Sequence, residues 1–455
     1  MGCGASSVKP CRHLYCLQCC QLLPGDKFDI ICNLCSEEFE LTEDQILNVK
    51  FSIPDESLEK ISFVDKLCKD HKTILSTSIK LNIQFTTENF LGLCDRLNKG
   101  PSLLTSVKFK LCQIDENSWK TIGNTLEKFS SIENLDFSKN IGMGDGLIII
   151  CKSLITSSNN VKDLNLSMCM LSENHWIEIG KILENFHRLK NVDLSGNRGI
   201  GDNGVLNICE GLKSSSTCLR YLNLSDCNFI FLAQWELICA LVGQLYYLEI
   251  VDLSYNTIQE NVLIPICKGL QSSFNSLISI NFSFCNFSSL ESKVLGNFLM
   301  DMPKLQKVNL SANKHMGVGL ALICNGLVES SNTLTTLSFV DCELNNEQCL
   351  NIAYALKKCH KIAFLNLSFN TNMGDGLESI CEGLLVAKDT LQSILCYKCF
   401  LTDSQKKVLL CLLVLCPSML CLDMRNEGDI NDGSIIIETM FLRLEFTEKI
   451  KKHQR

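Results

Sequence analysis

The sequence has few aromatic residues, no excess of basic residues and no long apolar run. Aromatic residues make up 7% of the 455 residues, and 50 Asp and Glu residues outnumber 42 Lys and Arg residues, which gives a formal net charge of −8. Nucleic-acid-binding chains are usually basic, so this balance disfavours a nucleic-acid partner.

No segment reaches the roughly 18 to 20 apolar residues that a membrane-spanning helix needs. Residues 408–416 form an apolar run of about half that length, which is predicted to be the core face of a helix. The chain has 28 cysteines. Because no secretory signal is recognisable, they are expected to be buried, reduced thiols of a cytoplasmic protein and not a disulfide framework.

A leucine-rich pattern repeats eleven times between Leu104 and Leu401, with a period of 28 to 30 residues. The residue that closes each predicted strand alternates between cysteine and asparagine: Cys112, Asn140, Cys169, Asn197, Cys227, Asn256, Cys285, Asn313, Cys342, Asn370 and Cys399. One strand and helix cannot cover their own apolar face, so neighbouring units must stack. The predicted fold class is α/β, a leucine-rich-repeat solenoid (horseshoe) with a parallel sheet on the concave face and helices on the convex face.

The repeated positions also predict how the core is built. An asparagine amide has both donors and acceptors, so the closing Asn is expected to bond backbone groups of the turn that would otherwise be buried unpaired. Trp119, Trp176 and Trp235 share one repeat position early in the outer helix. A shared position favours a packing role over an aromatic ligand cage.

The alternating Asn and Cys closures resemble the ribonuclease-inhibitor-like class of leucine-rich repeats. This cytoplasmic horseshoe class is also found in nucleotide-binding immune receptors and Ran GTPase-activating proteins, and the resemblance covers residues 76–425. It implies the fold but no particular partner, because function in this class depends on surface residues that differ between members.

A protein partner is expected on the concave face. One column of the repeat varies from unit to unit: Lys139, Met168, Gly196, Asp226, Tyr255, Phe284, Ala312, Asp341, Phe369 and Lys398. Exposed aromatic residues are enriched at binding hot spots. The predicted partner-binding residues, placed on the strands, are Met168, Asp226, Tyr255, Phe284, Phe364 and Phe369. The alternative, that the aromatic residues only pack on one another, stays open.

A cluster of cysteine and histidine residues precedes the repeats, at Cys11, His13, Cys16, Cys19, Cys32 and Cys35. Thiolates and imidazole at such spacings are typical tetrahedral zinc ligands. The alternative is a chance grouping in a cysteine-rich chain.

This cluster resembles the second half of a RING finger, the family that recruits ubiquitin-conjugating enzymes. By position, the resemblance implies one complete zinc site and half of a second: the first from Cys11, His13, Cys32 and Cys35, the second from Cys16 and Cys19. The family's opening Cys-x2-Cys is missing, and Asn33 and Ser36 stand where many active members have Pro and Arg. Zinc binding is therefore predicted, whereas ubiquitin-ligase activity is left open.

The first residues match the pattern for myristoylation at Gly2, with Cys3 available for palmitoylation, and two acyl chains would give stable membrane attachment. This expectation holds only if Met1 is the true start. An upstream start would explain the missing cysteine pair and make the lipid motif a coincidence.

The predicted domain organisation follows from these motifs. It comprises residues 1–36 as a partial RING-like zinc segment, 37–75 as a linker, 76–103 as an N-terminal cap or degenerate repeat, 104–425 as leucine-rich repeats, and 426–455 as a C-terminal cap and basic tail.

Three functions fit this organisation, and no Ser/His/Asp arrangement or pair of catalytic carboxylates is evident in the sequence. The leading hypothesis is a protein-interaction scaffold or adaptor. The second is an active RING-type ubiquitin ligase with the repeats as substrate receptor. The third is a small-GTPase regulator resembling the Ran activators, for which Arg198 is the candidate loop arginine.

Overall fold

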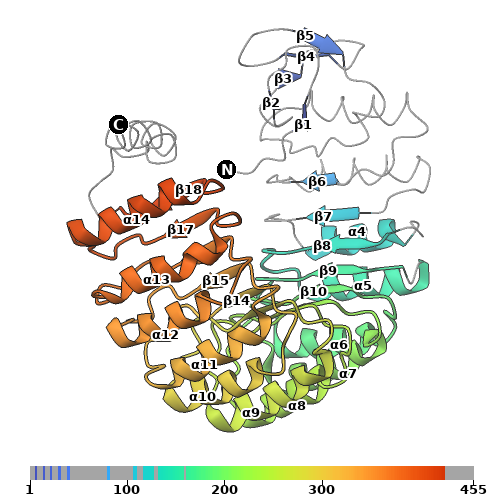
Figure 1. The fold of residues 1–455 in the computed structure, drawn as a ribbon. Coiled ribbons are helices and arrows are strands. Elements are labelled where there is room, and N and C mark those ends of the chain that lie inside the picture. Colours follow the sequence, from blue (N-terminus) through green and yellow to red (C-terminus); the bar gives the residue numbers. More distant parts are fainter. Residues whose placement is uncertain are drawn as a thin grey trace. The chain divides into compact units, whose positions relative to one another are not determined.

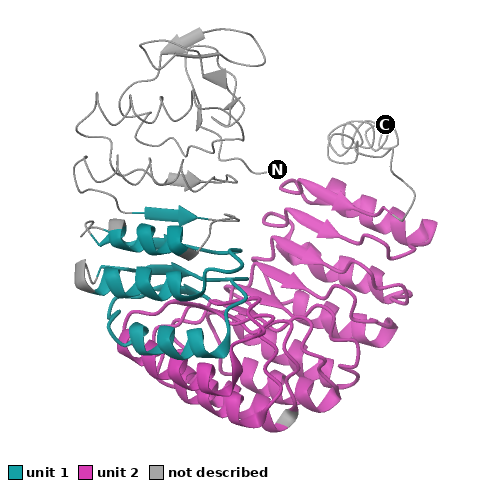
Figure 2. Ribbon diagram, turned by 180° about the vertical axis from the view of Figure 1, so that it is seen from behind, with its two compact units in different colours: residues 1–193 teal, residues 194–455 magenta. Residues whose placement is uncertain are grey.

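The computed structural model describes residues 106–109, 116–127, 132–157 and 160–425, together with the backbone of short strands that precede them. The chain divides into two compact units, residues 1–193 and 194–455 (Figure 2). Before the repeats, unit 1 contains two small antiparallel sheets: β1 (Ser6–Ser7) with β2 (Leu14–Tyr15), and β3 (Gln21–Leu22), β4 (Asp29–Ile31) and β5 (Glu38–Glu40).

The repeats of unit 1 form a parallel sheet in sequence order. Its strands are β6 (Ile79–Leu81), β7 (Ser106–Phe109), β8 (Asn134–Asp136), β9 (Asp163–Asn165) and β10 (Asn191–Asp193). The helices that connect them are α4 (Glu116–Leu126), α5 (Gly144–Ser157) and α6 (Glu173–Leu183).

Unit 2 continues the same strand and helix alternation. Its parallel strands are β11 (Tyr221–Asn223), β12 (Ile250–Asp252), β13 (Ser279–Asn281), β14 (Lys307–Asn309), β15 (Thr336–Ser338), β16 (Phe364–Asn366), β17 (Ser393–Leu395) and β18 (Cys421–Asp423). Its helices are α7 (Gly201–Leu212), α8 (Leu232–Val242), α9 (Glu260–Leu270), α10 (Ser289–Leu299), α11 (Gly319–Leu327), α12 (Asn346–Leu356), α13 (Gly376–Leu384) and α14 (Asp403–Leu415). Short 3-10 turns extend α7, α9, α11 and α13: η2 (Lys213–Ser215), η3 (Gln271–Ser273), η4 (Val328–Ser330) and η5 (Leu385–Ala387).

Within unit 2 the sheet curves, with the strands on the inner side and the helices on the outer side (Figure 1). The middle residue of each of these strands is buried, and in β12 and β13 both of its neighbours are half-buried. The α/β leucine-rich-repeat fold predicted from the sequence is therefore confirmed for the described repeats. The run at residues 408–416 lies in α14 and at its end, as predicted, but only part of it is core: Leu409, Leu412, Leu413 and Cys416 are buried, whereas Cys411 and Leu415 are exposed. Among the described residues, no helix is long and apolar enough to cross a membrane.

The core contains the repeated large side chains. Trp119, Trp176 and Trp235 are buried, which confirms their packing role. Trp119 lies edge-on to Phe109 at 5.8 Å between ring centroids, and Trp235 lies edge-on to Phe229 at 5.6 Å. Such edge-to-face pairs are a favoured aromatic geometry.

The closing asparagines bond the backbone between repeats, as predicted. The Asn370 amide nitrogen donates to the carbonyls of Phe339 and Leu367, at 2.7 and 2.8 Å. Its amide oxygen accepts from the N–H groups of Cys342 and Leu344, at 3.0 and 3.1 Å. One buried side chain therefore satisfies four backbone groups on two adjacent turns.

The closing cysteines make one weaker bond of the same kind. The Cys342 thiol donates to the Leu310 carbonyl at 3.4 Å, and the Cys169 thiol donates to the Phe137 carbonyl at 3.2 Å. Burial raises the pKa of both thiols from 9.0 to about 12. The described cysteines are free thiols, and most are buried.

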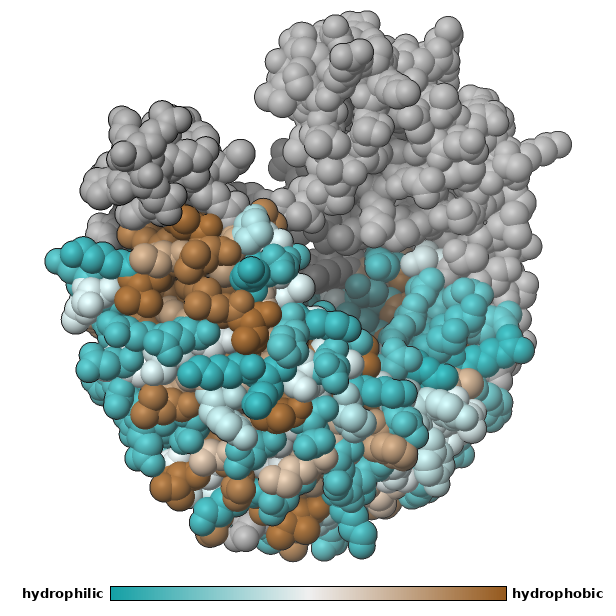
Figure 3. All heavy atoms as spheres, viewed as in Figure 1, coloured by the Kyte–Doolittle hydropathy of each residue, from teal (hydrophilic) through white to brown (hydrophobic). Residues whose placement is uncertain are grey.

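The last described repeats leave an apolar surface open. Figure 3 shows a broad hydrophobic area where α14 lies in Figure 1. Leu415, the last residue of α14, and Leu420, just before β18, are exposed. The predicted cap at residues 426–455 lies outside the described residues.

Replacing Gly326 with alanine is expected to destabilise the protein. A Cβ atom at Gly326 would lie 2.5 Å from the Gly296 carbonyl oxygen on the neighbouring helix. Overpacking of this kind costs about 1–3 kcal/mol, more than the helix propensity that alanine adds. Urea unfolding of Gly326→Ala should show this loss. Gly243→Ala is the control, because its Cβ would meet its nearest neighbour at 3.4 Å, and an equal loss there would contradict the account.

Replacing Asn370 with alanine is expected to lower the free energy of unfolding by at least about 3 kcal/mol, because several buried backbone groups lose their partners at once. The exposed Asn325 of α11 provides the matched control. Asn325→Ala should leave the urea midpoint unchanged or slightly higher. Similar midpoints for the two variants would show that the asparagine ladder does not stabilise the turns.

Stability should fall as the pH rises above about 9. The folded thiols keep their protons to about pH 12, whereas unfolded thiols lose theirs near 9.0, so the stabilising contribution is complete below 9 and is lost above it. The largest slope per thiol is about 1.4 kcal/mol per pH unit. Urea midpoints between pH 8 and pH 11 measure the effect. Cys342→Ala should reduce the slope, and an unchanged slope would contradict this prediction.

Candidate protein-binding surface at the strand-to-helix turns

The variable column lies in the turns and not on the strands. The variable residue follows three positions after the end of the strand and has a positive φ: Tyr255 follows β12, which ends at Asp252, with φ 58°, and Phe284 follows β13, which ends at Asn281, with φ 56°. The placement of Tyr255 and Phe284 on the strand is therefore wrong. We define the turn column as Lys139, Met168, Gly196, Asp226, Tyr255, Phe284, Ala312, Asp341, Phe369 and Lys398, all of which have positive φ.

Backbone bonds between repeats hold this left-handed conformation. The Tyr255 N–H donates to the Ser283 carbonyl at 2.9 Å, and the Phe284 N–H donates to the Ser311 carbonyl at 2.8 Å. The parallel pairing thus extends beyond the strands into the turns. Equivalent side chains on neighbouring turns are consequently held at about the strand spacing of 4.7–4.9 Å.

Tyr255 and Phe284 stack on each other and also remain open to solvent. Their rings are 4.2 Å apart between centroids and 11° from parallel. Yet Tyr255 is 53% exposed and Phe284 is 47% exposed. Packing of the rings and availability to a partner are therefore compatible. We call this pair the aromatic plate.

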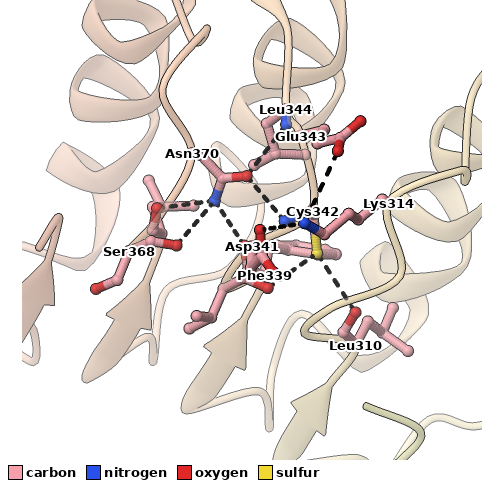
Figure 4. A network of polar contacts seen from close by, with 11 residues as sticks. Leu310, Lys314, Phe339, Asp341, Cys342, Glu343, Leu344, Ser368 and Asn370 are labelled. Carbon is pink, nitrogen blue, oxygen red and sulfur yellow. Dashed lines mark hydrogen bonds and ion pairs between the residues drawn. The ribbon is translucent and has the colours of Figure 1, made fainter. Parts of the chain in front are cut away.

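Ion pairs occupy the equivalent positions on both sides of the aromatic plate. Each joins the residue after a closing Asn to the turn-column residue of the next repeat. Arg198 contacts Asp226 at 2.7 Å, and Lys314 contacts Asp341 at 3.0 Å (Figure 4). The hydrogen bond to Asp341 raises the pKa of Lys314, which stays charged at neutral pH. At the plate the residue after the closing Asn is Thr257, a short side chain with no charge to pair.

The second predicted patch is assembled differently from the sequence interpretation. Phe369 meets Tyr397 edge-on at 5.4 Å, and the Lys398 ammonium lies 5.4 Å from the Phe369 ring centroid. Phe364 instead lies in strand β16, half-buried and five residues before Phe369. Tyr397 was missed, although its place two residues before a closing Cys could have revealed it.

The remaining predicted residues have different surroundings. Met168 is an exposed turn-column residue of unit 1. Asp226 is engaged by Arg198, so the arginine considered for a GTPase regulator already has a carboxylate partner within the chain.

The predicted metal and lipid residues lie outside the described residues. They are Cys11, His13, Cys16, Cys19, Cys32 and Cys35 for zinc, and Gly2 and Cys3 for acylation. Among the residues that the structure describes, no three His, Cys, Asp or Glu side chains are grouped so that they could hold a metal ion.

The repeats and their open turns define a leucine-rich repeat protein that offers a surface for protein contacts. No family model matches the chain. Ribonuclease inhibitor of Mus musculus is 27% identical over 322 residues, which cover 70% of this chain and 70% of that protein. Ribonuclease inhibitor of Sus scrofa is 24% identical over 377 residues, which cover 81% and 82%. These relatives support a ribonuclease-inhibitor-like leucine-rich repeat protein.

The similarity extends to part of a larger protein. Human NACHT, LRR and PYD domains-containing protein 12 is 28% identical over 258 residues, which cover 56% of this chain and 24% of that protein. Among solved structures, an internalin of Listeria monocytogenes is similar, with a TM-score of 0.41 and 15% identity over 75% of this chain and 84% of that one.

Proposed function

We propose that the protein is a scaffold that captures a protein partner on the inner side of the repeats, with the aromatic plate as the centre of contact. The supporting observation is the half-exposure of two stacked rings that backbone bonds hold in place. Rigid aromatic residues lose little entropy on binding, and they are enriched at hot spots.

The flanking ion pairs support the same site. Arg198 with Asp226 and Lys314 with Asp341 satisfy charges on both sides of the plate within the chain itself. The two rings of the aromatic plate lie between these ion pairs, and among the described residues no charged side chain pairs with them. A hot spot surrounded by satisfied polar groups is the arrangement expected at the centre of a protein interface.

Removal of both rings is expected to abolish partner binding. Proteins that co-purify with the wild type would be quantified for Tyr255→Ala/Phe284→Ala and for the control Tyr354→Ala/Phe274→Ala. The controls are equally exposed, at 53% for Tyr354 and 47% for Phe274, but lie on α12 and beside η3. The recovered amount of at least one co-purifying protein should fall by about 30-fold or more with Tyr255→Ala/Phe284→Ala and stay unchanged with the control variant, since a hot spot contributes about 2 kcal/mol or more. Equal recovery with both variants would refute the proposed site.

Zinc binding at the amino terminus is a second proposal, supported by the spacing of its cysteines and histidine. One complete site from Cys11, His13, Cys32 and Cys35 would bind zinc, and Cys16 and Cys19 would supply half of another. Such a module could link the captured partner to a ubiquitin-conjugating enzyme. The high number of free thiols supports a reducing, cytoplasmic location. Membrane contact through Gly2 and Cys3 stays a prediction.

The full-length protein is expected to contain about one tightly bound zinc ion, as one complete tetrahedral site requires. Cys32→Ala should lose that zinc, whereas Cys218→Ala, which removes a repeat cysteine, should retain it. Metal content would be measured by mass spectrometry of the purified proteins. A metal-free wild type would refute the zinc site. If the protein contains zinc but forms no ubiquitin chains in a reconstituted assay, the ubiquitin-ligase hypothesis is excluded and the scaffold function remains.

A further inference from the structure

One turn of unit 2 departs from the repeat at the position that caps the following helix. In the other described turns that begin with a closing Cys, the N-cap is polar and lies three residues after that Cys: Ser172, Ser288, Asn345 and Thr402. Helix α8 instead has Phe231 as its N-cap, four residues after Cys227. The turn therefore contains one extra residue and has lost its polar cap.

The altered turn exposes three consecutive apolar side chains, which we call the rim loop. Ile230 is 60% exposed, Phe231 is 55% exposed and Leu232 is 45% exposed. A phenylalanine side chain cannot accept a hydrogen bond from the first helical N–H groups, so this sequence lowers the stability of the helix end.

The rim loop is nevertheless held rigidly. The buried Gln234 side chain accepts hydrogen bonds from the N–H groups of Ile230 and Phe231, at 3.1 and 3.2 Å. Its amide nitrogen donates to the Asp202 carboxylate of the preceding repeat at 2.7 Å. A loop that is already ordered loses little conformational entropy when a partner binds.

The charges around the rim loop are acidic. Helix α8 carries Glu236 and no basic residue, and helix α7 carries Asp202 in its first turn, where the carboxylate accepts from the Gln234 side chain. Glu210 lies in the last turn of α7, away from the rim. The nearest preceding cation, Arg198, is paired with Asp226, and Lys213 after α7 is paired with Glu210. On the following helix, the basic residue Lys268 lies in the last turn, away from the rim.

We propose that the rim loop is a second docking surface, independent of the aromatic plate, for a protein segment with apolar side chains flanked by Lys or Arg. Apolar contact with the three exposed side chains would supply the main attraction. Asp202 of α7 and Glu236 of α8 would favour basic flanks through charge complementarity and would disfavour acidic ones.

Two fluorescently labelled helical peptides of 16 residues test the preference for apolar and basic side chains. One peptide consists of Leu and Lys, and the other consists of Leu and Glu. Fluorescence anisotropy would measure their binding to the full-length protein. The Leu/Lys peptide should bind at least ten-fold more tightly than the Leu/Glu peptide. Its affinity should fall at least ten-fold in Ile230→Ser/Phe231→Ser, but not in Phe274→Ser/Tyr354→Ser, which removes two apolar residues of similar exposure elsewhere. Equal affinities of the two variants, or a preference for the Leu/Glu peptide, would overturn the proposal.

A stability measurement separates docking from a structural role. Phe231→Ser restores a capping side chain, so its urea midpoint should equal or exceed that of the wild type. A lower midpoint would show that Phe231 serves folding and would overturn the proposal. Tyr255→Ala/Phe284→Ala should keep full peptide binding, so failure of the aromatic plate and failure of the rim loop give different results.

Discussion

The Asn or Cys side chain that closes each strand forms hydrogen bonds between the turns of neighbouring repeats. This bonding determines how the turns, and the side chains exposed on them, are arranged. Asn370 shows the principle, because its amide bonds carbonyls of two repeats and accepts from the turn before it. Cysteine at the alternate positions is smaller and supplies a single weak donor. Successive turns are consequently one strand spacing apart and share the same backbone conformation. In that conformation one residue of each turn has a positive φ.

This constraint separates residues that build the array from residues that are free to vary. A left-handed position has no need for a large side chain, and Gly196 and Ala312 occupy it in two repeats. Large rings at the same position in Tyr255 and Phe284 are therefore unnecessary for the backbone. Their stacking follows from the repeat spacing, whereas their exposure leaves them available to a partner.

The sequence was sufficient for the fold because the closing residues and buried leucines recur at fixed positions. It also identified the buried tryptophans, since a position shared by three units indicates packing. The positive φ of Tyr255 and Phe284 was not predictable from residue type, because aromatic residues rarely adopt it unless the surrounding backbone enforces it. The pairing of Arg198 with Asp226 was also missed, because it joins turns of adjacent repeats. In the sequence the rim loop is visible only as one extra residue between Cys227 and Trp235, which are eight positions apart where Cys169 and Trp176 are seven apart. Its meaning required the capping geometry of α8.

The fold does not need the two rings of the aromatic plate. Replacing both residues by glycine removes a ring stack worth about 0.5–1.5 kcal/mol and adds unfolded-state entropy, but it relieves left-handed strain of about 1–2 kcal/mol per residue. The free energy of unfolding of Tyr255→Gly/Phe284→Gly, measured with urea, should therefore lie within about 1 kcal/mol of the wild type or above it. A loss of about 3 kcal/mol or more would show that the rings stabilise the array, which would contradict their assignment to partner binding.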